Sequence, residues 1–116
     1  MKTKLGHLEI FVKEPLKAKD FYINMLGFEL VEIQGEKFVW LKMGDSLILL
    51  RPGNSAIKSD TYQKTNIAMV IYTDDLEKTL NEYKSCGLLI KGDDTGCPVF
   101  TDSDGNWFQL VNRNEL

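Results

Sequence analysis

Hydrophobic and polar residues alternate through residues 5–12 of the chain. One face of this extended segment is apolar and consists of Leu8, Ile10 and Val12. The opposite face carries His7, Glu9 and Phe11. Strict alternation of this kind predicts a β-strand, because successive side chains of a strand point to opposite faces.

A helix and three further strands are predicted after this first strand. Pro15 suits the first turn of a helix and Gly27 suits its end, so residues 16–26 are predicted to be helical. Short β-prone runs separated by turn residues follow, and their close spacing predicts antiparallel hairpins over residues 28–33, 37–43 and 46–50. The first half therefore has the order β-α-β-β-β.

The second half repeats this order of elements. Residues 52–65 have no clear period and contain several turn formers, which is typical of a connection. A strand is predicted over 67–72, and Asp74 with Glu77 forms a capping-box pattern that predicts a helix over 75–85. Further strands are predicted over 88–91, 98–101 and 107–112, with Asp104-Gly105 as the last hairpin turn.

The two halves align as an internal duplication. His7 matches Asn66, Gly27 matches Gly87 and Gly44 matches Gly105, with two one-residue insertions between these landmarks. A module of about 50 residues can hardly bury a core alone, so two copies are expected to act together. We expect function to lie between the copies.

Composition narrows the class of protein. The 116 residues suit one domain, and 14 basic against 17 acidic residues give a net charge of -3, which argues against a nucleic-acid partner. No apolar run approaches the roughly 20 residues of a membrane-spanning helix, and the N-terminus lacks a signal peptide, so a cytoplasmic protein is expected. Cys86 and Cys97 match no redox or zinc motif and are expected to be reduced thiols.

Three segments resemble the vicinal oxygen chelate superfamily, which includes glyoxalases, ring-cleaving dioxygenases and the bleomycin- and fosfomycin-resistance proteins. They are GHLEIFV at 6–12, FYINMLGF at 21–28 and DSDGNWFQLV at 102–111. The resemblance implies an α+β fold of two tandem β-α-β-β-β modules that form a cupped mixed sheet around a cavity. It implies a single domain over 1–116, with a first module at about 4–51, a connection at about 52–65 and a second module at about 66–113. It also implies a homodimer.

The resemblance further assigns the family's four metal-ligand positions to His7, Ile48, Asn66 and Gln109. Only His7 carries the usual ligand type. Isoleucine has no lone pair, and two neutral amides without a carboxylate would bind a transition metal weakly. The chemistry of these residues therefore predicts no bound metal and no cofactor.

Candidate site residues follow from the strand faces. Glu9 shares a face with His7, so the two form either a proton-transfer pair or a structural contact in which a neighbouring strand satisfies Glu9. Arg51 either contacts an anionic ligand or is solvated, and the second is favoured. The predicted ligand-binding residues, which could instead fill the core, are Phe11, Trp40, Ile48, Leu50, Asn66, Ala68, Tyr72, Trp107 and Gln109.

Three functions remain open at this point. The preferred one is a metal-independent protein that binds a small organic ligand in the cavity between the modules. The second is a lyase- or dioxygenase-like enzyme, either with an atypical metal site at His7 or with metal-free acid/base chemistry by His7 and Glu9. The third is an interaction role without a small-molecule ligand.

Overall fold

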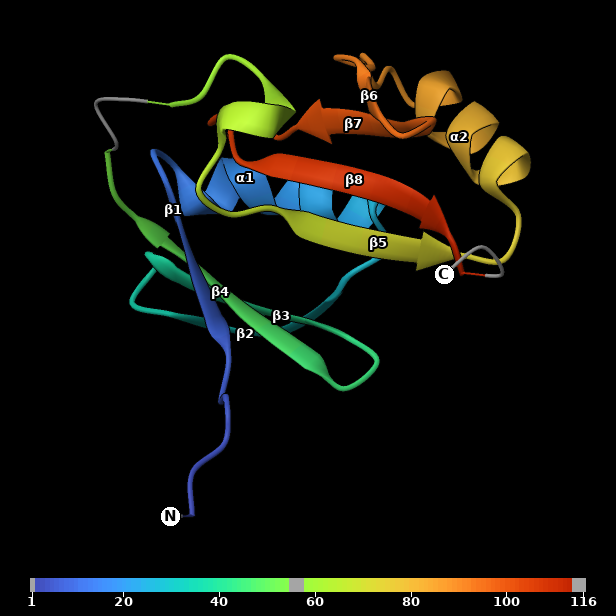
Figure 1. The fold of residues 1–116 in the computed structure, drawn as a ribbon. Coiled ribbons are helices and arrows are strands. Elements are labelled where there is room, and N and C mark those ends of the chain that lie inside the picture. Colours follow the sequence, from blue (N-terminus) through green and yellow to red (C-terminus); the bar gives the residue numbers. More distant parts are fainter. Residues whose placement is uncertain (1, 55–57, 114–116) are drawn as a thin grey trace. The chain divides into compact units, whose positions relative to one another are not determined.

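The computed structural model describes residues 2–54 and 58–113. The chain divides into two compact units, Met1–Ser55 and Ala56–Leu116, and each contains one four-stranded sheet (Figure 1). The division falls within the segment predicted to be a connection. That the whole chain forms one domain stays a prediction, as do the homodimer and the cytoplasmic location.

The first unit has the order β-α-β-β-β. Its elements are β1 (Leu8–Val12), α1 (Pro15–Asp20), a π-helical turn (Phe21–Met25), β2 (Glu29–Gln34), β3 (Phe38–Met43) and β4 (Ser46–Pro52). The strands lie in the order β1-β4-β3-β2. β1 runs parallel to β4, and the other pairs are antiparallel.

The second unit repeats this order. A short 3-10 helix (Tyr62–Lys64) precedes β5 (Met69–Thr73), α2 (Leu76–Ser85), β6 (Asp93–Asp94), β7 (Cys97–Thr101) and β8 (Trp107–Asn112). The strand order is β5-β8-β7-β6, with β5 parallel to β8. The predicted α+β class and the predicted tandem β-α-β-β-β modules are therefore confirmed.

One face of the first sheet forms the core of its unit against α1, which contacts β3 and β4. The strand register determines which side chains lie on this face. Ile10 on β1 and Val39 on β3 both pair with Leu50 on β4, so the three point to the same side. Each buried side chain of this size contributes about 1.5–3 kcal/mol. The side chains of this face, at most 7% exposed, are Ile10, Val12, Val39, Leu41, Ile48 and Leu50.

The helix predicted at 16–26 is α-helical only as far as Asp20. The chain then widens into the π-helical turn, where the Leu26 N–H donates to the Phe21 carbonyl at 3.2 Å. Gly27 follows at φ +86°, a conformation that favours glycine. The wider turn carries Tyr22 into the core, where it is fully buried and contacts Phe28 edge-to-face.

Two predictions for the second unit are wrong. Residues 88–91 form no strand, because Leu88 closes the end of α2 with its N–H on the Tyr83 carbonyl at 3.1 Å, and the short β6 begins only after Gly92. Asp75 rather than Asp74 is the N-cap of α2, and its carboxylate accepts from the Lys78 N–H at 3.1 Å.

The hairpin turn predicted at Asp104-Gly105 is present, and Asp102 organises it. The Asp102 carboxylate accepts from the backbone N–H groups of Asp104 and Asn106, both at 2.9 Å, and from the Asn106 side chain. Asp102 is only 4% exposed, so the turn has a buried anchor at the entry to β8.

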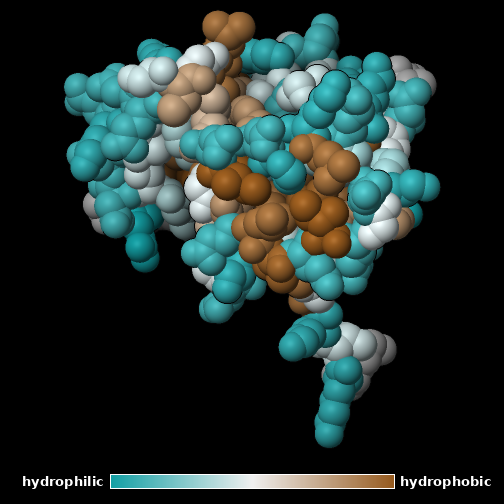
Figure 2. Space-filling model, turned by 180° about the vertical axis from the view of Figure 1, so that it is seen from behind, coloured by the Kyte–Doolittle hydropathy of each residue, from teal (hydrophilic) through white to brown (hydrophobic). Residues whose placement is uncertain are grey.

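Among the described residues, no helix has the length and apolar character needed to cross a membrane. Apolar side chains are nevertheless exposed on strands of both units, and Figure 2 shows apolar surface on the face opposite to the view of Figure 1. The exposed apolar residues of β2 are Leu30, Val31 and Ile33.

Candidate functional site

The face of the first sheet that points away from α1 carries polar and aromatic side chains. Directly paired residues on neighbouring strands point to the same face, so the register arranges these side chains in rows. One row runs from β1 to β2 through Glu9, Leu49, Trp40 and Glu32. The next row contains the pair Phe11 and Arg51 and the pair Phe38 and Gln34. We call these rows, together with His7, the open face of the first sheet.

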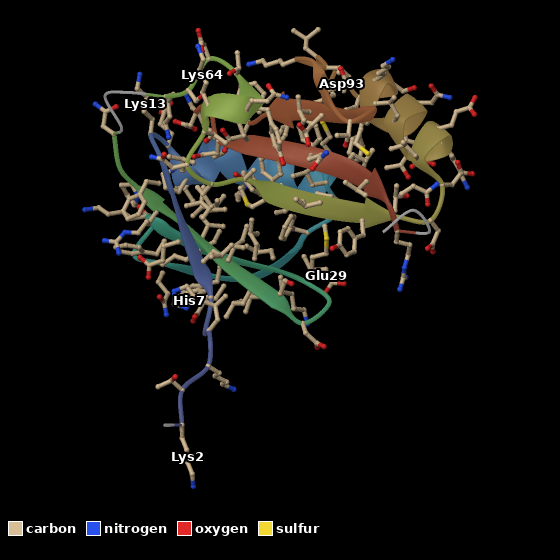
Figure 3. The ribbon with its side chains drawn as sticks, viewed as in Figure 1. Lys2, His7, Lys13, Glu29, Lys64 and Asp93 are labelled. Carbon is tan, nitrogen blue, oxygen red and sulfur yellow. The ribbon has the colours of Figure 1, made fainter. Side chains whose placement is uncertain are left out.

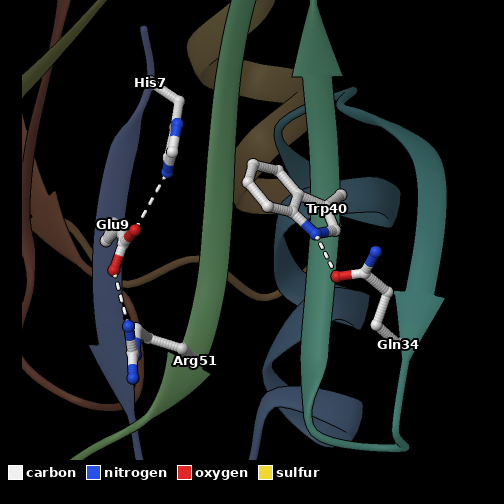
Figure 4. A network of polar contacts seen from close by, with 5 residues as sticks. All are labelled: His7, Glu9, Gln34, Trp40 and Arg51. Carbon is white, nitrogen blue, oxygen red and sulfur yellow. Dashed lines mark hydrogen bonds and ion pairs between the residues drawn. The ribbon is translucent and has the colours of Figure 1, made fainter.

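Glu9 lies between a histidine and an arginine on this open face (Figure 4). His7, directly before β1 (Figure 3), places its Nε2 atom 3.0 Å from Glu9 Oε2. Arg51 on β4 donates from Nη1 to Glu9 Oε1 at 2.8 Å. The structure therefore brings together His7 and Glu9, as the alternation of β1 predicts, and adds Arg51 from a strand far along the chain.

These contacts determine the charge of Glu9. The hydrogen bond from Arg51, and after it the hydrogen bond from His7, lowers the pKa of Glu9 from its ordinary value of 4.5, although desolvation acts in the opposite direction. Glu9 is therefore a carboxylate at neutral pH, with a donor on each oxygen. A carboxylate held in this way is a weak proton acceptor, so the structure favours the reading in which a neighbouring strand satisfies Glu9.

Two phenyl rings lie beside the Arg51 guanidinium. Its central carbon is 5.2 Å from the ring centroid of Phe11 on β1 and 5.4 Å from that of Phe38 on β3, within cation–π range. The Nε atom of Arg51 is buried and has no hydrogen-bond partner within the described part of the chain. The guanidinium therefore donates from Nη1 to Glu9, and its Nε has no acceptor among the described residues.

Gly53, directly after β4, allows Phe11 to occupy this position. Its N–H donates to the Val12 carbonyl at 3.0 Å, which draws the two backbones together. A Cβ atom at residue 53 would lie 2.6 Å from Cδ2 and 2.7 Å from Cβ of Phe11, distances that atoms in proteins do not adopt. The absence of a side chain at Gly53 thus keeps the Phe11 ring beside Arg51.

Trp40 contacts His7 through its ring and Gln34 through its indole N–H. The rings of His7 and Trp40 meet edge-to-face with centroids 4.8 Å apart. The indole N–H of Trp40 donates to Gln34 Oε1 at 3.0 Å (Figure 4). The Gln34 amide donates in turn to Glu32. Trp40 is thus oriented on both sides, with its ring remaining on the open face.

Ile48 and Leu50 are not on the open face and therefore do not lie beside His7 and Glu9, and a ligand role for them stays a prediction. They pair with Leu41 and Val39 and lie in the core against α1. The residue of β4 that pairs with Glu9 and Trp40 is Leu49. Residues 47–50 are all apolar, so alternation could not decide which of them faced the helix.

The second unit uses the equivalent surface differently. Gln109 on β8 is 8% exposed, and its side-chain amide is bound at both ends within its own unit. Its Oε1 accepts from the Tyr62 hydroxyl at 3.0 Å, and its Nε2 donates to the Asp94 carbonyl at 3.2 Å. Burial raises the pKa of Tyr62, with a smaller contribution from the Asp94 carboxylate, so the phenol remains a donor.

The other predicted site residues of this unit differ in burial and in their place relative to the strands. Trp107 is 3% exposed, and its indole N–H donates to the Ser59 carbonyl at 3.0 Å. Tyr72 is 59% exposed on β5. Asn66 and Ala68 lie just before β5 and outside any strand. A ligand role for each of these residues stays a prediction.

The residues at the family's metal positions do not fit a transition metal. Within residues 2–54 and 58–113, no group of three or more histidine, cysteine or carboxylate side chains is placed to hold a metal ion. Gln109 has both ends of its amide engaged, and the β4 residue that pairs with Glu9 on the open face is Leu49 rather than a carboxylate. Transition metals prefer imidazole and carboxylate ligands, which leaves His7 without suitable partners.

Arg51, Phe38 and Leu49 lie on the open face but are not among the predicted ligand-binding residues. Arg51 was favoured to be solvated, yet it anchors Glu9 and contacts two rings. The signal that could have found it was the alternation of β4 beyond residue 50, since Arg51 follows Leu49 by two residues on the same strand.

The fold and the sequence motifs define a protein of the duplicated β-α-β-β-β class. The chain belongs to the Glyoxalase/Bleomycin resistance protein/Dioxygenase superfamily, whose family model matches residues 4–110. Comparison with curated proteins gives no match.

Solved structures share this fold at low sequence identity. The chain is similar to the fosfomycin resistance protein FosX from Listeria monocytogenes (18% identity, TM-score 0.77, 95% of this chain and 91% of that one). It is similar to TnmS3, an antibiotic binding protein from Streptomyces sp. CB03234 (23%, 0.71, 97% and 98%). It is also similar to lactoylglutathione lyase from Agrobacterium tumefaciens (14%, 0.70, 98% and 97%). At these identities the likeness establishes the fold alone.

Proposed function

We propose that this protein binds a small organic molecule without transforming it, and that the open face of the first sheet contributes the binding surface. The observation that carries the proposal is the composition of that face, where aromatic rings and a few oriented polar groups lie together. Binding sites for small molecules are typically apolar and aromatic, with sparse polar groups that fix orientation. The similarity to TnmS3, an antibiotic binding protein, supports the same class of function.

Metal independence is part of this proposal. It is supported by the donor set, since His7 is the single good transition-metal ligand among the positions that the family uses. FosX, a structural neighbour, has been solved with Mn(II) and a dihydroxypropylphosphonic acid, so members with this fold do use metals. In the present chain we assign no chemical step to a metal.

Acid/base catalysis by His7 and Glu9 is the competing function. The 3.0 Å contact between the two side chains favours it. The lowered pKa of Glu9 disfavours it, because a general base works best when its pKa lies near the working pH. Arg51 stabilises the charged form of Glu9 and so opposes the proton transfer that catalysis would need.

Ligand-observed NMR with a chemically mixed library tests the proposal. The library contains neutral, cationic and anionic compounds, both aromatic and aliphatic. The expected result is saturable binding of at least one compound class, no turnover of the bound compound, and affinity unchanged by chelator or by added Mn²⁺, Ni²⁺ or Zn²⁺. Binding that requires a metal, and that is lost in His7→Ala, would contradict the metal-independent function.

A further inference from the structure

We infer that Arg51 is the anchor for an organic carboxylate, and that the molecule bound on the open face is a flat aromatic acid. The inference rests on the proposed function and names its ligand class. It starts from the arrangement of donors on Arg51, a residue for which the sequence leaves contact with an anionic ligand as one of two roles.

A guanidinium group presents its donors along distinct edges. Carboxylates prefer to take two parallel hydrogen bonds from one edge, which gives both energy and orientation. Glu9 contacts Arg51 through Nη1. Nε, on the other side of the group, is buried and has no acceptor within the described residues. A buried donor without an acceptor is costly, and a ligand carboxylate on that side would satisfy it.

The surroundings of Arg51 select an aromatic acid over an aliphatic one. Phe11 and Phe38 lie beside the guanidinium, and Trp40 lies in the adjacent row of the same face. Phe11 is 47% exposed, so its ring can pack on an incoming planar molecule.

The unused donor of Arg51 favours an anion over a cation at this point of the open face. Glu9 is the one carboxylate in direct contact with His7 and Arg51 among the described residues, and each of its oxygens already has a donor. A ligand cation would have to displace Arg51 from Glu9. A ligand carboxylate instead meets an edge of Arg51 that Glu9 does not use.

A matched pair of ligands tests the inference, with 2-naphthoate as the acid and 2-naphthamide as its neutral control. The chain has two tryptophans, so its ¹H–¹⁵N spectrum contains two indole N–H signals. Trp40→Phe assigns them. We expect 2-naphthoate to shift the Trp40 signal and to bind roughly ten- to hundredfold more tightly than 2-naphthamide by calorimetry, the range that a hydrogen-bonded charge contributes.

Variants separate the charge of Arg51 from its geometry. Arg51→Gln is expected to reduce the affinity for 2-naphthoate to that of 2-naphthamide, and Arg51→Lys is expected to restore only part of the difference, because lysine has no planar edge. Arg113→Gln is the matched control, since Arg113 is an exposed arginine of the second unit and its replacement changes the net charge equally. It is expected to leave the affinity unchanged.

Glu9→Gln is expected to change the affinity for 2-naphthoate in the opposite direction to Arg51→Gln. It removes the negative charge beside Arg51 and keeps an oxygen that can accept from it, so the affinity for 2-naphthoate should rise. Weaker acid binding in Glu9→Gln would overturn the inference, as would failure of 2-naphthoate to shift Trp40.

Equal binding of acid and amide at Trp40 would overturn the acid inference and leave the proposed function standing. Absence of binding by every compound of the mixed library would instead contradict the proposed function. The two failures are therefore distinguishable.

Discussion

Replacing Gln109 by glutamate tests the closed amide network of the second unit. The change is nearly isosteric. Glutamate keeps the acceptor for the Tyr62 hydroxyl but loses the Nε2 donor that bonds the Asp94 carbonyl at 3.2 Å. In Gln109→Glu a carboxylate oxygen therefore faces a carbonyl oxygen at a position that is only 8% exposed.

The magnitude follows from the lost contact. Removing one hydrogen bond and leaving the Asp94 carbonyl without its donor costs about 2–3 kcal/mol in the free energy of unfolding. For a chain of this size that corresponds to a melting temperature lower by about 8–12 °C. The new carboxyl group is buried beside another oxygen, so its pKa is raised, and its neutral form can donate to Asp94.

The sign of the pH dependence follows from that raised pKa. Gln109→Glu should regain stability as the pH falls, because the neutral form restores a donor, and should lose it as the pH rises through the raised pKa. Urea unfolding followed by tryptophan fluorescence at pH 5 and pH 8 measures both values. Asn81→Asp, the same amide-to-acid change at an exposed position of α2, should shift stability by no more than about 0.5 kcal/mol. If the Gln109→Glu protein were as stable at pH 8 as the Asn81→Asp protein, the stabilising role of the hydrogen bonds between Gln109, Tyr62 and Asp94 would be refuted.

Three further changes test other parts of the structure. Arg51→Gln removes the largest cause of the lowered pKa of Glu9, so carboxyl NMR titration should give a higher pKa, and an unchanged value would contradict the contact. In wild type, the stability that Glu9 contributes should be present above pH 4.5 and lost as the pH falls through its lowered pKa. Gly53→Ala should cost about 1–3 kcal/mol in thermal unfolding, because the new methyl group overlaps Phe11, and unchanged stability would argue against the close approach. Asp75→Ala should cost about 0.5–2 kcal/mol by loss of the helix cap, whereas Asp74→Ala should change little.

The fold was largely predictable because its signals are local and occur twice. Alternation marked β1, and Gly27 and Gly87 marked the two helix ends. The apolar run after Gly87 was misassigned because its first residue, Leu88, closes the end of α2 rather than entering a strand. That choice depends on a backbone hydrogen bond to the preceding helix, which local strand propensity does not contain.

The site was less predictable because its contacts join distant segments. Arg51 meets Glu9 across 42 positions of the chain, and Tyr62 meets Gln109 across 47. Periodicity can place two residues on one face of their own strands, but it contains no information about which side chain from another strand lies beside them. The parallel register of β1 and β4 supplies that information for Arg51.

The same topology has produced two different surfaces in the two modules, and this difference bears on where a ligand can bind. In the second module, polar groups of β8 are engaged by their own unit, since Tyr62 and Asp94 take both ends of the Gln109 amide and Ser59 takes the indole N–H of Trp107. In the first module the open face contains Arg51, whose Nε has no acceptor among the described residues. A ligand acting on β8 would have to break two or three existing hydrogen bonds, whereas a ligand acting on Arg51 would supply a missing one. The balance of hydrogen bonds therefore favours the first module as the place where recognition begins.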